Sequence, residues 1–323
     1  TLINFAEKIS SFSSPLAVGM SGNFRQMKRR ILNIAVFRKE TLYQKMRALI
    51  IYLVISAVFI GCTPILSIDA STQSVYHFSD TDKNISLLDI SETFGTYDGS
   101  FVLYDNNLDS WKIYDLEEAT KRIPPESTYK IYDALLGLES GIITPEHSSM
   151  TWNGDAFPFP SWEADQDLNS AMQNSVNWYF QAIDSQLGIN RVQEFLNKIE
   201  YGNQTTSSNL DLYWSDFSLK ISPLEQVTLL KKFNTNEFHL NFQNVFSVKN
   251  AIKIASTPNG NFYGKTGTGR VNGQDINGWF IGYVETSDNS YYFATNIQSD
   301  SNATGKKAFE ITSDILKKLH IWN

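Results

Sequence analysis

The sequence predicts an α/β (α+β) fold in which an antiparallel sheet is flanked by helices, with a helical subdomain and a preceding transmembrane helix. Strand-like runs occur at both ends of residues 96–323, with helix-like patterns between them. A 21-residue uncharged run precedes this region. With 323 residues, 42% hydrophobic and 19% charged, the chain can bury a sizeable core, and wholesale disorder is excluded.

The uncharged run Ala48–Ile68 is long enough, at roughly 30 Å as a helix, to cross a bilayer. Residues 1–47 carry nine Lys/Arg and two acidic residues, whereas acidic residues follow the run. The positive-inside rule therefore predicts a single span in the cell membrane, with residues 1–47 cytoplasmic and the C-terminal domain extracellular. A buried core helix is the alternative, and a lipoprotein signal ending at Gly61-Cys62 is another.

Composition excludes several classes of function. The 18 basic and 32 acidic residues after position 47 argue against nucleic acid as a partner. The single cysteine, Cys62, excludes a disulfide framework. The four histidines are far apart in the sequence and form no metal-ligand spacing, so we predict no metal site in this chain.

The order of elements predicts four segments: a cytoplasmic basic segment (1–47), a transmembrane helix (48–68), a linker (69–95) and an extracellular domain (96–323). Residues 101–104 and 111–114 form a predicted hairpin, and 261–264, 278–284 and 291–296 are predicted strands. Helical patterns follow Ser127 and cover 167–187, 191–199, 222–233 and 303–319. Strands from both ends indicate one sheet with a helical insert.

Three short motifs carry the candidate chemistry. In Ser127-x-x-Lys130 a helix would place the lysine one turn after the serine, where a neutral, buried amine could remove the hydroxyl proton. Ser175-Val176-Asn177 lies in the amphipathic stretch 167–187, and Lys265-Thr266-Gly267 lies in a strand pattern. Each motif alone is a common pattern. In this order together they match the signature of penicillin-recognising serine enzymes.

Further motifs resemble class D (oxacillinase-type) β-lactamases over residues 98–319. Residues 125–139 look like the active-site helix of that class, and Tyr201-Gly202-Asn203 matches its Tyr-Gly-Asn motif. Trp214 with residues 219–223 resembles the region that packs on a carboxylated lysine. The resemblance implies a serine β-lactamase/penicillin-binding-protein-like fold.

Two features resemble the BlaR/MecR-type receptors rather than secreted class D enzymes. Residues 1–61 look like the end of their membrane zinc-peptidase domain, whose HExxH motif would lie upstream of Thr1 in a longer protein. The second motif ends in Asn177, where class D enzymes usually carry an apolar residue. An amide beside Lys130 could hydrogen-bond the amine and compete with a carbamate, so that an acyl-serine would persist.

The resemblance also implies a role for each residue. Ser127 would be the nucleophile, and Lys130, N-carboxylated by CO2 in the free protein, would be the acylation base. Ser175 would relay a proton to the lactam nitrogen, and Lys265 with Thr266 would bind the drug carboxylate. An oxyanion hole would involve the N–H groups of Ser127 and Thr268. Other residues expected at the drug or the carbamate are Asn177, Gly267 and Trp214.

The sequence thus predicts a membrane-bound sensor and signal transducer that β-lactam antibiotics acylate, with slow or no deacylation. No cofactor is expected apart from the carbamate on Lys130. The resemblance implies a cytoplasmic repressor as partner, reached through the upstream protease domain. A class D β-lactamase that hydrolyses the drug is the first alternative. A peptidoglycan D,D-transpeptidase or carboxypeptidase is the second.

Overall fold

A computed structural model describes residues 74–79, 83–207 and 209–323 of the chain. These residues belong to one compact unit, residues 68–323. The predicted membrane span at 48–68 and the cytoplasmic segment lie outside the described residues. Within the described ranges, no helix combines the length and apolar character that a membrane crossing needs.

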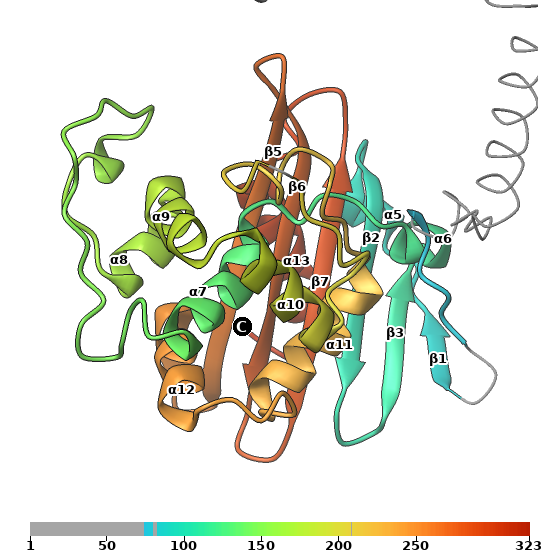
Figure 1. The fold of residues 1–323 in the computed structure, drawn as a ribbon. Helices are drawn as coiled ribbons and strands as arrows, with labels where there is room; N and C mark the ends of the chain where they lie inside the picture. Colours follow the sequence, from blue (N-terminus) through green and yellow to red (C-terminus); the bar gives the residue numbers. More distant parts are fainter. Residues whose placement is uncertain (1–73, 80–82, 208) are drawn as a thin grey trace, which may run out of the picture. The chain divides into compact units, whose positions relative to one another are not determined.

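A seven-stranded sheet with the order β1-β3-β2-β7-β6-β5-β4 forms the centre of the domain (Figure 1). Strand β2 pairs antiparallel with β7, which joins the N-terminal hairpin to the C-terminal strands and confirms the predicted single sheet. The strands are β1 (Asn84–Leu87), β2 (Asp98–Asp105), β3 (Ser110–Tyr114), β4 (Lys253–Thr257), β5 (Gly260–Val271), β6 (Gln274–Glu285) and β7 (Ser290–Gln298).

The sheet is mixed, so the prediction of an antiparallel sheet was wrong at one edge. Strand β1 pairs in parallel with β3, and it lies within the range 69–95 that was predicted as a linker. Three of its four residues are exposed, so the sequence carries no alternation of buried and exposed positions there. Strand β4 at the opposite edge was missed for the same reason.

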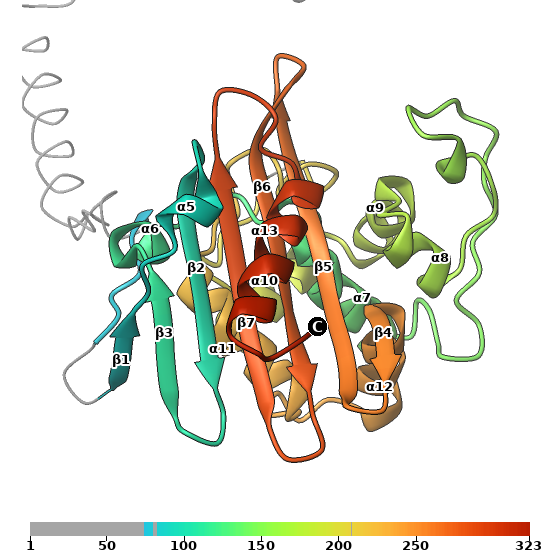
Figure 2. The ribbon, with the colours of Figure 1, turned by 180° about the vertical axis from the view of Figure 1, so that it is seen from behind.

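Helices cover both faces of the sheet. Helix α13 lies on one face, and α7, α10 and α11 lie on the other (Figures 1 and 2). The described helices are α5 (Ser91–Phe94), α6 (Leu116–Thr120), α7 (Lys130–Glu139), α8 (Leu168–Gln173), α9 (Asn177–Leu187), α10 (Ile189–Ile199), α11 (Pro223–Asn234), α12 (Phe242–Ala251) and α13 (Gly305–Lys318), with short 3-10 helices η1 (Glu126–Tyr129) and η2 (Pro160–Trp162).

Two hydrophobic clusters hold these layers together, because successive side chains of a strand point to opposite faces. Phe101 of β2 and Phe280 of β6 pack with Ile311 of α13 on one face. Val102 of β2 and Ile281 of β6 belong to the larger cluster on the other face, together with α7 and α11. A strand that is buried on both faces has a continuous apolar sequence, as residues 101–104 show.

Candidate active site

Ser127 lies in η1, and Lys130 is the first residue of α7, so the two residues are one helical turn apart. The Nζ atom of Lys130 is 3.0 Å from Oγ of Ser127. The lysine side chain is fully buried. The predicted juxtaposition of hydroxyl and amine is therefore present in the structure.

Three further oxygen atoms surround the Lys130 amine. Nζ donates to the backbone oxygen of Ser175 at 2.7 Å and to Oδ1 of Asn177 at 2.5 Å, and Oγ of Ser175 is 3.2 Å away. Burial lowers the pKa of Lys130 well below its usual value, and the nearby charge of Lys265 lowers it further. A neutral amine has two N–H groups, which the two carbonyl-type oxygens accept. Its lone pair then remains for the Ser127 hydroxyl.

Ser175 lies at a break between two helices, where a single helix over residues 167–187 had been predicted. Helix α8 ends at Gln173, and the Ser175 and Val176 N–H groups donate back to the carbonyls of Met172 and Ala171. This pattern is a Schellman motif, and its left-handed position usually holds glycine. Here Ser175 occupies it, with φ of 55°. The strained backbone turns both the Ser175 hydroxyl and its carbonyl toward Lys130.

Strand β5 brings the third motif to the same place. Nζ of Lys265 donates to Oγ of Ser175 at 2.9 Å and to the backbone oxygen of Thr266 at 3.0 Å. The Ser175 hydroxyl therefore lies between two buried lysine amines. Burial lowers the pKa of Lys265 to about 7.

Glycines let β5 pass close to the nucleophile turn. A Cβ atom on Gly267 would lie 3.0 Å from Cβ of Glu126 and 3.3 Å from the backbone nitrogen of Ser127. A Cβ atom on Gly269 would meet the carboxyl group of Glu126. These contacts place the β5 backbone beside the backbone nitrogen of Ser127.

These residues open into a cleft of about 340 Å³. Five predicted residues line it: Ser127, Ser175, Asn177, Thr266 and Thr268. The sequence interpretation missed Arg270, which also lines the cleft and forms an ion pair with Asp275. The alternation of Thr266, Thr268 and Arg270 along one strand face could have revealed it. The rim includes Phe159 and Trp162.

Trp214 is buried behind the nucleophile turn and is not among the residues that line the cleft. Its backbone oxygen accepts a hydrogen bond from the Glu126 N–H at 3.0 Å, and its ring stacks on Tyr129. The Tyr-Gly-Asn motif is structural in the same way, because the side-chain amide of Asn203 bonds the backbone of residues 218 and 220. Trp214 and the Tyr-Gly-Asn motif thus have structural roles near the turn that carries Ser127.

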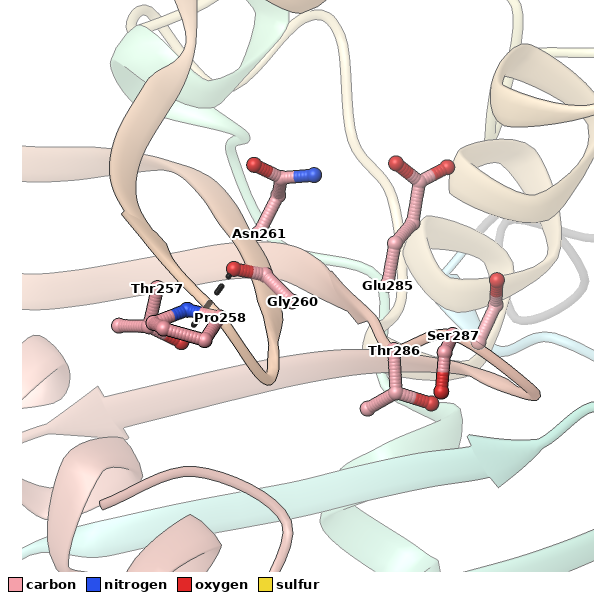
Figure 3. Close-up of a pocket in the computed structure, with 8 residues that line it drawn as sticks. Thr257, Pro258, Gly260, Asn261, Glu285, Thr286 and Ser287 are labelled. Atoms are coloured by element: carbon pink, nitrogen blue, oxygen red, sulfur yellow. Dashed lines mark hydrogen bonds between the residues drawn. The ribbon is translucent and has the colours of Figure 1, made fainter.

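A second hollow, of about 420 Å³, lies at the turns that join β4 to β5 and β6 to β7 (Figure 3). Its lining is polar and includes Thr257, Asn261 and Glu285, and none of the predicted site residues belongs to it. Over the described ranges, no three His, Cys, Asp or Glu side chains gather closely enough to hold a metal ion. The cleft at Ser127 is therefore the candidate active site.

Comparison with known proteins agrees with this geometry. The family model for the penicillin binding protein transpeptidase domain matches residues 99–317. Regulatory protein BlaR1 of Bacillus licheniformis is 42% identical over 325 aligned residues, which cover 99% of this chain and 53% of that protein. The chain thus spans about half the length of the curated relatives it matches most fully.

Solved structures extend the likeness to the fold. The C-terminal domain of the Bacillus licheniformis BlaR penicillin-receptor is 45% identical, with a TM-score of 0.73 over 75% of this chain and 99% of that domain. The class D β-lactamase BAT-2 is 36% identical, with a TM-score of 0.69 over 73% of this chain and 97% of that enzyme. The chain therefore belongs to the penicillin-binding protein transpeptidase domain family, and its motifs and relatives place it with the BlaR/MecR type.

Proposed function

We propose that β-lactams acylate this domain at Ser127 and that the acyl group stays in place, so that the domain acts as a β-lactam sensor. The observation that carries this proposal is the Lys130 amine, which is 3.0 Å from the Ser127 hydroxyl and is bonded at 2.5 Å to Asn177. The first contact supplies a base for acylation. The second disfavours a carbamate on Lys130, which would be the base that activates water for hydrolysis.

Acylation would proceed by general-base catalysis. The neutral Lys130 amine takes the hydroxyl proton while Oγ of Ser127 bonds to the lactam carbonyl carbon. The N–H groups of Ser127 and Thr268 stabilise the oxyanion. The lactam C–N bond then breaks, and the ring nitrogen receives a proton through the Ser175 hydroxyl, which contacts both lysine amines. The Lys265 ammonium, with Thr266 beside it, attracts the drug carboxylate.

The predicted carbamate on Lys130 competes with the observed hydrogen bonds. Adding CO2 to the amine leaves a single N–H for two acceptors, the Ser175 carbonyl and the Asn177 amide oxygen. One buried acceptor would lose its donor, at a cost of about 1–3 kcal/mol. We therefore infer that little carbamate survives beside Asn177, and that hydrolysis of the acyl-serine is slow for this reason.

The whole-protein role follows from the relatives as a proposal. The BlaR1 relative carries the description "regulatory protein", and a related C-terminal domain is described as a penicillin-receptor. We propose that this chain is the C-terminal part of such a receptor, anchored by residues 48–68 with the sensor domain outside the cell. A cytoplasmic repressor would be reached through a zinc-peptidase domain upstream of Thr1.

Intact mass spectrometry after mixing with benzylpenicillin tests the proposal. We expect one drug mass to add without loss of atoms, and peptide mapping to place it on Ser127. The Ser127→Ala variant should take up no drug. An adduct on another residue, or no adduct and no drug consumption, contradicts the proposal.

The two alternatives predict different products. A class D β-lactamase would consume many equivalents of drug and return to its starting mass. A D,D-transpeptidase or carboxypeptidase would release D-alanine from a D-Ala-D-Ala peptide. The similarity to the class D β-lactamase BAT-2 supports the β-lactamase alternative. The hydrogen bond between Lys130 and Asn177 favours the sensor function.

A further inference from the structure

Helices α7 and α9 pack against each other through polar residues as well as apolar ones. Lys130 and Asn177 meet at the cleft end of this interface. Asp133 lies one turn further along α7, and Asp184 lies two turns further along α9, each on the same face as its predecessor. The carboxyl groups of Asp133 and Asp184 are in hydrogen-bonding contact with each other.

Both aspartate side chains are fully buried. Over the described residues, no donor hydrogen-bonds to either carboxyl oxygen of Asp133 or to Oδ2 of Asp184. The other oxygen of Asp184 accepts a long hydrogen bond, at 3.4 Å, from the Tyr213 hydroxyl. Two ionised carboxylates cannot coexist in such contact without water, whereas one proton between them supplies the missing donor.

Charge arguments agree with this geometry. Burial raises the pKa of both carboxyl groups well above the usual range, and for Asp133 the charge of Asp184 adds to that effect. The other titratable groups near the pair are buried phenols and the exposed side chain of Asp211, and Lys130 is the cationic group that interacts with the pair. Glu126 and Lys265 are the other titratable groups that act on Lys130. The phenols belong to Tyr129, Tyr179 and Tyr213.

We propose that Asp133 and Asp184 share one proton, and that the single remaining negative charge favours the ammonium form of Lys130. The pair would act on the drug only through Lys130, by lowering the fraction of Lys130 that is in the neutral amine form. This inference deepens the proposed function, because it rests on Lys130 acting as the base for Ser127. An ammonium group can neither activate water nor add CO2, so the same charge helps the acyl-serine to persist.

The pH profile of acylation tests the electrostatic part of the proposal. We expect the acylation rate to rise with pH as Lys130 loses its proton. In the Asp133→Asn/Asp184→Asn double variant the negative charge is absent, so the rising limb should move to lower pH by about one unit. Glu139→Gln is a matched control, because it is an exposed acid-to-amide change on the same helix. Its profile should coincide with that of the unmodified protein.

Infrared difference spectroscopy tests the shared proton without any drug. The unmodified protein at neutral pH should show the carbonyl stretch of a protonated carboxyl group that the double variant lacks. Glu126, whose burial raises its pKa to about 8, contributes a similar band to both proteins and cancels in the difference. Melting temperatures check folding. If the double variant is unfolded, Asp133→Asn replaces it: the new amide N–H takes the place of the shared proton, so the carboxyl band should be lost, and because Asp184 keeps the single negative charge, the pH profile of acylation should stay unchanged.

The outcomes separate the two claims. No carboxyl band in the difference spectrum overturns the shared proton. A band together with a pH profile that is unchanged in the double variant overturns the influence on Lys130. If the unmodified protein is never acylated at Ser127, the proposed function fails, while the infrared result still decides whether the pair shares a proton.

Discussion

Lys130 is the residue on which the two halves of the proposed chemistry depend. Its amine is buried and touches four oxygen atoms, two of which can only accept hydrogen bonds. Acceptors stabilise N–H groups, whereas a carbamate needs donors for its anionic oxygens. The hydrogen-bond acceptors around Lys130 therefore favour a free amine over a carbamate. This supports the proposal that Lys130 promotes acylation but not hydrolysis.

Replacing Asn177 by valine removes one of those acceptors and leaves an apolar neighbour. In the Asn177→Val variant we expect more carbamate on Lys130 and faster loss of the acyl group, by tenfold or more, since about 1.4 kcal/mol corresponds to tenfold. Carbon-13 NMR in labelled bicarbonate measures the carbamate, and mass spectrometry follows the adduct. An unchanged adduct lifetime together with a visible carbamate would contradict the role given to Asn177.

The lowered pKa of Lys265 predicts that drug binding depends on pH, independently of the acylation step. Because its pKa is about 7, its ammonium form dominates below that pH and its neutral form above it. A drug carboxylate binds the ammonium form better, so the dissociation constant should increase between pH 7 and pH 9, by up to tenfold per unit. Calorimetry on the Ser127→Ala variant measures this constant. A β-lactam esterified at its carboxylate is the control and should show a flat profile, and a flat profile for the free acid would exclude this role for Lys265.

At the scale of elements, the approach of β5 to η1 decides where the nucleophile lies. Glu126 precedes Ser127 with φ of 53°, and its buried carboxyl group accepts a hydrogen bond from Asn277 of β6. Bare backbone at Gly267 and Gly269 makes room for this turn. The strained residue and the two glycines thus hold the serine against the strand.

The Gly267→Ala variant tests this contact. Its new methyl group would lie 3.0 Å from Cβ of Glu126 and 3.1 Å from the Pro125 carbonyl, so strand and turn must move apart. We expect acylation to slow by at least tenfold with a smaller loss of thermal stability. Gly273→Ala, in the turn after β5, is the control for backbone strain without crowding, because φ of 80° disfavours alanine there although no atom lies within 4 Å of the new methyl; it should lose stability and keep its acylation rate. An acylation rate unchanged in Gly267→Ala would show that the close approach is unnecessary.

The elements also show what sequence patterns can and cannot predict. The three motifs lie at a helix start, a helix break and a strand. Their order in the sequence was enough to predict that Ser127, Ser175 and Lys265 belong to one site. The break at Ser175 was not predicted, because the apolar period of α8 continues into α9. It depends on a left-handed residue that is not glycine, which local propensity does not indicate.

For the whole molecule, the central strands were predictable because they are apolar on both faces and flank the insert. The edge strands β1 and β4 were not, since their stability comes from pairing rather than burial. The Asp133–Asp184 pair could not be foreseen from the sequence either. Its partners are 51 positions apart, and only the packing of α7 on α9 brings them together.

The proposed membrane span at residues 48–68 predicts that the C-terminal domain lies outside the cell, and this can be tested in cells. If the span and its orientation are correct, protease added outside intact cells should digest residues 96–323 and leave the cytoplasmic segment protected. Permeabilised cells are the control, in which both parts are accessible. Protection of the C-terminal domain in intact cells would reverse the predicted orientation.

The most direct test of the account is the stoichiometry of chromogenic cephalosporin turnover. Rapid mixing should give a burst of one equivalent of ring-opened product per protein, followed by a steady rate far slower than the burst. The mass of the protein should remain increased by one acyl group over the same period. Continuous turnover without a burst, with the protein at its original mass, would contradict the claim that Lys130 and Asn177 permit acylation of Ser127 but not hydrolysis of the acyl-serine.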